Sequence, residues 1–116
     1  MLASSGNVGI GIVSALTGVG DDPAMFQITA PIRLGLAGAP ILNQHGRVIG
    51  IVVRDLTEVR GGLPPDVGFG IRLRQIRGFL DRHDIDYQVS GRTLAVSNPQ
   101  IAKEAIAYTL RIQCIE

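Results

Sequence analysis

The stretch that decides the fold is residues 26–54, FQITAPIRLGLAGAPILNQHGRVIGIVVR. It contains short apolar runs separated by turn-forming residues, and we expect strands at 24–29, 41–42 and 47–55. The last two form a hairpin across NQHG, in which Gly46 suits the left-handed position that such turns often need. Residues 30–39 (APIRLGLAGA) are too glycine-rich for a regular element, so they predict a loop of functional type.

The flanking segments extend this pattern. Residues 8–16 (VGIGIVSAL) alternate with a period of two, and residues 67–71 (VGFGI) form another short apolar run, so both predict strands. Residues 17–23 (TGVGDDP) and 57–66 (TEVRGGLPPD) are rich in glycine, proline and aspartate, which predicts turns and loops. The first two thirds of the chain are therefore expected to be β-rich.

The pattern changes to helical spacing near residue 72. One apolar stripe recurs three or four positions apart and consists of Leu73, Ile76, Phe79, Leu80 and His83. This stripe predicts an amphipathic helix of about three turns, with His83 as a half-buried packing residue. Beyond it we expect strands at 86–90 and 93–96, a helix with Asn98 as N-cap and Pro99 at its first position, and a strand over 108–114.

Composition narrows the function classes. The chain has 116 residues, 46% of them hydrophobic and 18% charged, which suits one domain with a core. No uncharged apolar run reaches the roughly 18–20 residues of a membrane span, and a net charge of +1 gives no nucleic-acid footprint. One cysteine excludes an internal disulfide framework and a Cys-based zinc site, and we expect no metal and no cofactor. The start, MLASS, lacks the basic and apolar regions of a signal peptide.

Four short motifs follow one another along the chain: GIVSAL at 11–16, FQITAP at 26–31, GRVIG at 46–50 and VGFGI at 67–71. In this order and spacing they resemble the second β-barrel of trypsin-like serine peptidases, particularly the bacterial HtrA-like ones. The resemblance implies a mainly β fold, a single Greek-key trypsin-like β-barrel of about six strands followed by a C-terminal helix. We therefore expect the barrel and its helix over residues 1–87 and a short α/β tail over residues 88–116. A complete trypsin-like fold needs two barrels and roughly 200 residues, so only one barrel fits.

The same resemblance locates an active-site loop without its nucleophile. The family pattern G-N-S-G-G-P falls on residues 35–40, GLAGAP, which places Ala37 where the nucleophilic serine stands. An alanine methyl group cannot attack a carbonyl carbon, and the family's histidine and aspartate belong to the first barrel, outside the matched region. The oxyanion donors of the family correspond to the backbone N–H groups of Gly35 and Ala37. Leu36 and Ala39 also depart from the pattern, and an alanine fits poorly if position 39 takes a positive φ.

The resemblance also implies a peptide groove. Its residues correspond to Pro31 and Ile32 at the base of the pocket and to Val52, Val53 and Arg54 along the strand after the hairpin. Because the base is apolar and carries no carboxylate, a bound peptide would pair with an edge strand and present small apolar side chains. The alternative is that these residues only fill the barrel.

Other reactive side chains have structural explanations. A new triad of His45, Asp55 and a serine is disfavoured, because the glycine loop has no serine and His45 belongs to a hairpin turn. Cys114 is either a buried small apolar residue or, in a larger periplasmic protein, the partner of a cysteine outside this chain.

Three functions follow from these observations. The first is a catalytically inactive relative of trypsin-like peptidases that binds a peptide or protein segment as a pseudoenzyme. The second is a fragment of a two-barrel serine protease whose activity needs the missing N-terminal barrel. The third is a free-standing module that self-associates through the apolar surface that normally faces the other barrel. Membership of a bacterial trypsin-like protein would place the chain in the periplasm or outside the cell.

Overall fold

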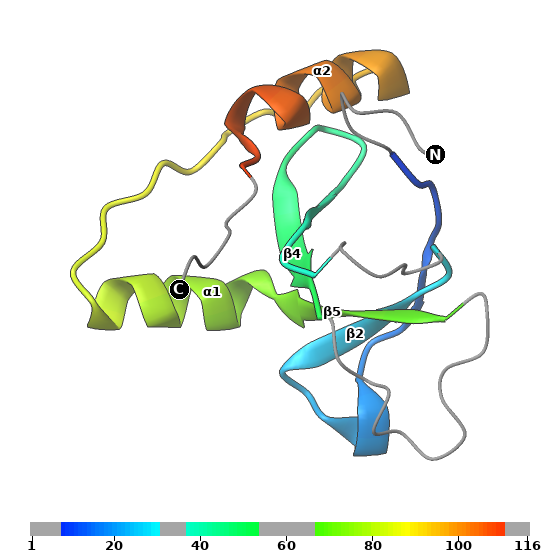
Figure 1. Ribbon diagram of the computed structural model, residues 1–116, viewed down its shortest axis with the longest axis vertical. Coiled ribbons are helices and arrows are strands. Elements are labelled where there is room, and N and C mark those ends of the chain that lie inside the picture. Colours follow the sequence, from blue (N-terminus) through cyan, green and yellow to red (C-terminus); the bar gives the residue numbers. More distant parts are fainter. Residues whose placement is uncertain (1–7, 31–36, 54–66, 111–116) are drawn as a thin grey trace, which may run out of the picture.

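The computed structural model describes residues 8–30, 37–53 and 67–110, and within them it has five strands and two α-helices (Figure 1). The strands are β1 (Val13–Ala15), β2 (Met25–Ile28), β3 (Pro40–Leu42), β4 (Val48–Val52) and β5 (Gly68–Arg72). A short 3-10 helix, η1 (Val19–Asp21), lies between β1 and β2, and the helices α1 (Leu73–Arg82) and α2 (Asn98–Tyr108) follow β5. The described chain is therefore β-rich up to residue 72, as predicted.

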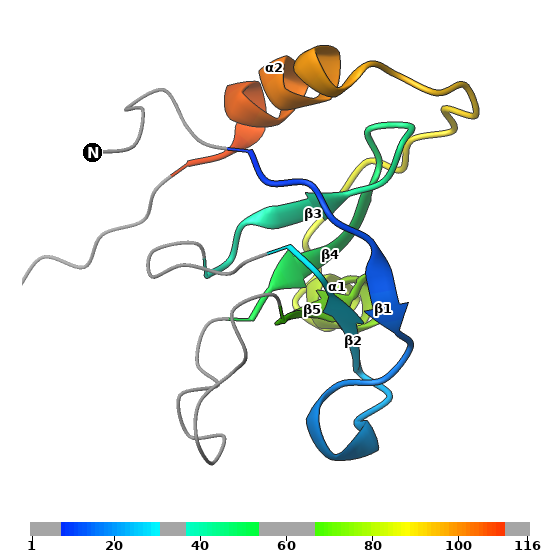
Figure 2. The same cartoon turned by 90° about the vertical axis from the view of Figure 1, so that its right-hand side faces the viewer.

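The strands form one antiparallel sheet in the order β1-β2-β5-β4-β3 (Figure 2). β2 and β5 are distant in sequence but pair in the sheet, with Phe26 opposite Gly70 and Ile28 opposite Gly68. Among the described residues the sheet is open, and β1 and β3 are its edges. The mainly β prediction is thus confirmed, whereas the described strands do not close into a barrel.

The core is built around the Phe26 ring. The Phe26 side chain is 4% exposed, and its ring lies against Gly70 of the neighbouring strand β5 and Gly50 of β4, the next strand beyond it. An ideal Cβ on Gly50 would come within 2.7 Å of the ring, and one on Gly70 would come within 2.9 Å. The side chains buried among the described residues are those of Phe26, Ile28, Val52, Phe69 and Ile101. The glycines of β4 and β5 therefore provide the space that the aromatic ring fills.

The hairpin between β3 and β4 forms at its predicted place. The Asn43 side chain organises the turn, since its Oδ1 accepts hydrogen bonds from the N–H groups of His45 at 2.9 Å and Arg47 at 3.0 Å. Asparagine commonly caps turns in this way. Gly46 has a φ of +74°, which confirms its predicted left-handed conformation.

The first strand is shorter than its alternating sequence predicts. Next to it, the Ile12 N–H donates to the Thr29 hydroxyl at 2.9 Å, and the Ile12 carbonyl accepts from the Thr29 N–H at 3.0 Å. A side-chain oxygen thus replaces a backbone carbonyl, so the regular ladder does not continue toward residue 8. Gly11 is required here because an added Cβ would lie 2.6 Å from the Ala30 nitrogen.

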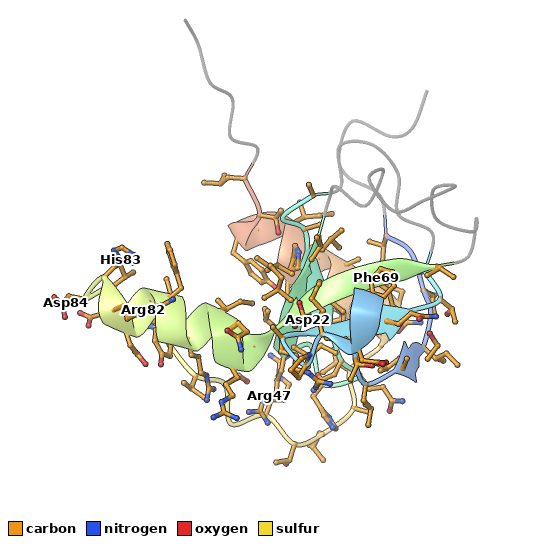
Figure 3. All side chains as sticks on the ribbon, turned by 90° about the horizontal axis from the view of Figure 1, so that it is seen from below. Asp22, Arg47, Phe69, Arg82, His83 and Asp84 are labelled. Carbon is orange, nitrogen blue, oxygen red and sulfur yellow. The ribbon has the colours of Figure 1, made fainter. Side chains whose placement is uncertain are left out.

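Helix α1 confirms the prediction from the apolar stripe. It contacts β4 and β5 and then extends away from the sheet, so that Arg82, His83 and Asp84 lie at its far end (Figures 1 and 3). The His83 ring lies 4.5 Å from the Phe79 ring, measured between centroids, and both side chains are exposed. The expectation that His83 is half-buried is therefore wrong, because no described element packs over the last turn of the helix.

The strands predicted at 86–90 and 93–96 do not form. The described segment from residue 85 to residue 97 contains no helix or strand, and one of its backbone hydrogen bonds runs from the Val96 N–H to the Gln44 carbonyl at 2.9 Å. An extended segment becomes a strand only when a neighbour pairs with it along its length. The alternating sequence here has no such neighbour among the described residues.

Helix α2 begins one residue earlier than its predicted cap implies. Ser97 is the N-cap, and its hydroxyl accepts from the Gln100 N–H at 3.4 Å, so Asn98 is the first helical residue. The strand predicted over 108–114 is wrong at its start, because Tyr108 ends the helix and residues 109–110 are not in a strand. The rest of that segment, including Cys114, lies outside the described residues.

Helix α2 lies across the turn of the β3–β4 hairpin (Figure 1). Its Ile101 side chain is buried, and an ideal Cβ on Gly46 would be 3.7 Å from the Ile101 Cγ1 atom. Arg92 donates to both carboxylate oxygens of Glu104, at 2.8 Å and 3.1 Å, and to the His45 carbonyl at 3.3 Å. Arg92 thus bridges α2 and the hairpin, through a bidentate ion pair with Glu104 and a hydrogen bond to the His45 carbonyl, and Ile101 adds an apolar contact.

Candidate functional site

The turn formed by Ala37, Gly38 and Ala39 is held against the end of β4. The Gly38 N–H donates to the Val52 carbonyl at 2.9 Å, and the Val52 N–H donates to the Ala39 carbonyl at 2.9 Å. Ala37 and Gly38 are exposed. The loop that the sequence singled out is therefore a surface turn whose position relative to β4 is set by two backbone hydrogen bonds.

The backbone of this turn accommodates the alanine at position 39. Gly38 has a φ of +82°, and Ala39 is not among the described non-glycine residues with positive φ. The left-handed conformation therefore falls on a glycine, which adopts it without steric cost. An alanine at position 39 is therefore compatible with this turn.

Two residues of the predicted groove lie beside the turn. Val52 is 8% exposed and bonded to the turn through both of its backbone groups, while the half-buried Val53 donates its N–H to the Phe69 carbonyl at 3.0 Å. Both backbone groups of Val52 and the N–H of Val53 therefore have partners already, so a peptide finds no free N–H donor at these two residues. The other predicted site residues are outside the described part of the chain: Gly35, Pro31, Ile32 and Arg54.

Chemically, the described part of this site offers backbone groups and apolar surface. Ala37 supplies no nucleophile, and Asp55 lies outside the described residues. His45 is at the opposite end of the β3–β4 hairpin, where its buried Nδ1 atom has no hydrogen-bond partner among the described residues, and His83 is at the far end of α1. Within the described ranges, no cluster of histidine, cysteine, aspartate or glutamate could hold a metal ion.

The strongest electrostatic interaction of the described residues lies away from the Ala37 turn. Hydrogen bonds from Arg92, and secondarily from Gln100, lower the pKa of the Glu104 carboxyl below its usual range. The same interaction raises the pKa of Arg92, and burial raises the pKa of Tyr108 nearby. These groups stabilise the contact between α2 and the hairpin and do not take part in the candidate site.

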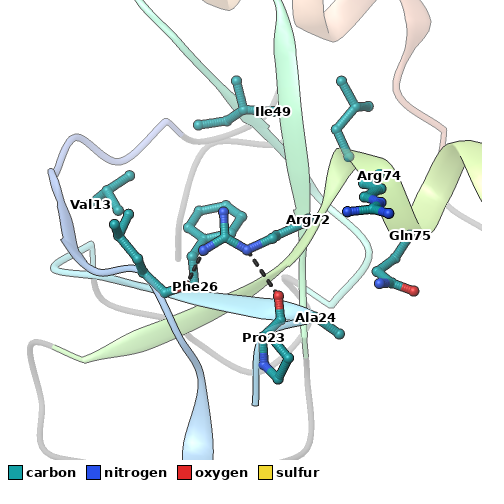
Figure 4. A pocket seen from close by; sticks show the side chains of 10 residues that line it. Val13, Pro23, Ala24, Phe26, Ile49, Arg72, Arg74 and Gln75 are labelled. Carbon is teal, nitrogen blue, oxygen red and sulfur yellow. Dashed lines mark hydrogen bonds between the residues drawn. The ribbon is translucent and has the colours of Figure 1, made fainter. Parts of the chain in front are cut away.

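A second feature escaped the sequence analysis. A cavity of about 760 Å³ opens between the end of β1, the start of β2 and the beginning of α1, and Arg72 lies in it (Figure 4). The sequence pattern that could have located Arg72 is the two-residue period of a strand, which puts Gly68, Gly70 and Arg72 on one face of β5. Because Gly70 on that face contacts Phe26, Arg72 could have been predicted to lie next to the core.

No described helix is long and apolar enough to cross a membrane.

The chain is similar to an uncharacterized protein, y4bJ, of Sinorhizobium fredii (strain NBRC 101917 / NGR234). The two are 33% identical over 119 residues, which cover 98% of this chain and 19% of that protein. No protein-family model and no solved structure matches the chain. The chain thus spans about a fifth of the length of this curated relative.

Proposed function

We propose that the chain is the second-barrel part of a trypsin-like serine peptidase relative that has lost catalysis and binds extended peptides. The observation that carries the proposal is the turn at Ala37, which is exposed and held against β4. In the resemblance to the family, Ala37 corresponds to the nucleophilic serine, and alanine has no reactive oxygen. The positive φ at Gly38 supports the proposal, because a tight active-site loop needs a residue with this backbone freedom.

The strand order supports the barrel part of the proposal. β3, β4 and β5 are consecutive neighbours, and β2 lies beside β5, which is the arrangement of a Greek key. β1 then lies outside β2, so that β1 and β3 are the two edges of the sheet among the described strands. One strand added between these two edges would close a six-stranded barrel.

The peptide-binding part rests on the end of β4. Val53 is half-buried and lies next to the Val52 position that bonds to the Ala37 turn. Extended peptides are selected by pockets for alternate side chains. Since both Val52 backbone groups and the Val53 N–H already have partners, the proposed peptide lies along the exposed Ala37 turn and contacts the Val53 side chain.

A second candidate, a fragment of a longer two-barrel protease, is favoured by one observation. The matched segment makes up 19% of the relative from Sinorhizobium fredii, so homologous sequence exists within a much longer chain. In that case, proteolysis or peptide binding belongs to the whole protein, and a first barrel supplies the histidine and aspartate of the triad.

Labelling with a fluorophosphonate probe and digestion of a generic protein substrate test the loss of catalysis. We expect no labelling of this chain, and none of the Ala37→Ser variant, because no described histidine is placed next to position 37. The Ala39→Ser variant is the matched control for a serine added to the same turn. Labelling of the unmodified chain at any serine would overturn the inactive assignment, and labelling of the full-length relative would favour the second candidate.

Nuclear magnetic resonance titration with a library of short apolar peptides tests binding. We expect shifts at the backbone amides of Ala37, Gly38 and Val53. Val89, which lies in the segment between the helices, serves as the unaffected reference position. Peptides that leave all three amides unshifted at millimolar concentration would refute the peptide-binding role.

A further inference from the structure

The Arg72 guanidinium lies within a largely apolar cavity where β5 leads into α1, and the polar side chains of Arg74 and Gln75 also line it. The cavity has a volume of about 760 Å³, and its apolar walls come from Val13, Leu16, Phe26, Ile49 and Leu73. Figure 4 shows the Arg72 guanidinium in front of the Phe26 ring, in the middle of this space. The volume lies within the range of about 300–1,000 Å³ that is typical of sites for small ligands.

Arg72 is anchored by neutral groups. Its Nε–H donates to the Pro23 carbonyl at 3.1 Å, a terminal N–H donates to the Leu16 carbonyl, and the guanidinium carbon is 5.9 Å from the centroid of the Phe26 ring. An arginine side chain has five N–H donors, so these two bonds leave other N–H groups of Arg72 without a partner among the described residues. The contacts fix where the guanidinium lies without neutralising its charge.

No carboxylate of the described residues lies within 4.0 Å of Arg72, and the ion pair found among them joins Arg92 to Glu104 instead. Charged groups removed from water are ordinarily paired, because an unpaired charge in apolar surroundings is costly. Arg72 is half-buried, and the exposed Arg74 adds a second positive charge at the rim of the cavity. The site therefore favours an anionic ligand group.

We propose that this cavity binds a carboxylate carried on an apolar body. The planar fork of a guanidinium matches the two oxygens of a carboxylate, and the aliphatic and aromatic walls suit an uncharged apolar remainder. The ligand is either a free alkanoate or the carboxyl terminus of an apolar peptide, which share this chemistry. The site is distinct from the Ala37 turn. Arg72 is the last residue of β5, whereas the turn bonds to Val52 of β4, which pairs with Gly70 in the middle of β5.

A matched pair of variants at Leu16 tests the proposal without disturbing the core. The Leu16 side chain lines the cavity yet is 70% exposed, so small polar replacements are compatible with folding. Leu16→Asp places a carboxylate beside Arg72 that competes with the ligand, whereas Leu16→Asn has nearly the same shape and no charge. The Leu16→Asp variant should therefore bind a carboxylate at least tenfold more weakly than Leu16→Asn.

The binding experiment is a titration of isotope-labelled chain followed by nuclear magnetic resonance. The probes are octanoate and its neutral analogue octanamide, and we expect octanoate to bind at least tenfold more tightly and to shift the amides of Leu16, Ala24 and Leu73. Equal affinity for the two probes, equal weakening by both Leu16 variants, or no saturable shift at millimolar octanoate would each overturn the proposal.

A second pair of probes distinguishes the two ligand sources. These are the peptide acetyl-Leu-Val-Leu with a free carboxyl terminus and the same peptide with a carboxamide terminus. If the free acid binds more tightly than octanoate, the ligand is a peptide carboxyl terminus; if octanoate binds more tightly, it is an alkanoate. An amidated peptide that binds as tightly as the free acid would contradict the role of Arg72.

Discussion

The packing of the Phe26 ring against two glycines makes a specific prediction about adding one methyl group to the core. In Gly70→Ala, the new Cβ would lie 2.5 Å from the Ile41 Cδ1 atom and 2.9 Å from the Phe26 Cζ atom. Both contacts are with side-chain ends that can move. Overpacking of this kind costs about 1–3 kcal/mol, and the lower chain entropy of alanine in the unfolded state returns about 0.4–1 kcal/mol. We expect a net loss on the order of 1 kcal/mol in the free energy of unfolding.

Gly50→Ala is the matched comparison. There the new Cβ would lie 2.5 Å from the Ile71 carbonyl oxygen, a backbone atom in the paired strand, as well as 2.7 Å from the Phe26 ring. A backbone clash cannot be relieved by a rotamer change, so this variant should lose about 3 kcal/mol, at the upper end of the overpacking range.

Replacing the Phe26 ring distinguishes the side-chain clash of Gly70→Ala from the backbone clash of Gly50→Ala. Phe26→Leu removes the Cε1 and Cζ atoms that both new methyl groups would meet. The clash of Gly50→Ala with the Ile71 carbonyl oxygen remains, so Phe26→Leu should restore a larger share of the lost stability in the double variant with Gly70→Ala than in the one with Gly50→Ala. Urea unfolding followed by circular dichroism gives each free energy by linear extrapolation. The packing argument is refuted if Gly70→Ala stabilises the chain, or if Phe26→Leu relieves both glycine variants equally.

Two further predictions concern association and pH. The run from residue 8 to residue 20 is uncharged, and Ile10 is 74% exposed next to the edge strand β1. The chain should therefore self-associate at tens of micromolar, and Ile10→Lys should reduce the association seen by light scattering. Val89→Lys, at a position 59% exposed, is the control and should not reduce it. Hydrogen bonds from Arg92 lower the pKa of the Glu104 carboxyl. The stabilisation by this carboxylate is therefore fully present above the usual carboxyl pKa and is lost as the pH falls through the lowered pKa. Amide chemical shifts of the hairpin turn should report this pH dependence, and Glu104→Gln should abolish the dependence.

The elements that could be predicted are those whose signals are local. The β3–β4 hairpin follows from Asn43 and Gly46, whose side-chain bonding and backbone freedom act within four residues. α1 follows from a stripe of residues one turn apart. The strands expected at 86–90 and 93–96 failed because their alternation is also local, whereas a strand requires a partner that the described residues do not supply.

In the candidate site, too, features with local sequence signals could be predicted and features that depend on distant segments could not. The glycine-rich loop and the absence of a serine from it were read directly from the sequence. That the positive φ falls on Gly38 and not on Ala39, and that Val52 is saturated by the turn, could not be predicted. Both depend on how the loop returns to β4, which is set by hydrogen bonds between segments separated by the whole hairpin.

By itself, the sequence determined the β-rich first part, the β3–β4 turn, the position of α1 and the absence of a serine from the loop at Ala37. Only the tertiary structure decided that β2 pairs with β5 and that Arg72 lies in an apolar cavity without a described acidic partner. The physical reason is the range of the interactions. Turn chemistry and hydrophobic periodicity act over a few residues, whereas strand neighbours and the surroundings of a charge depend on segments that meet only after the chain has folded.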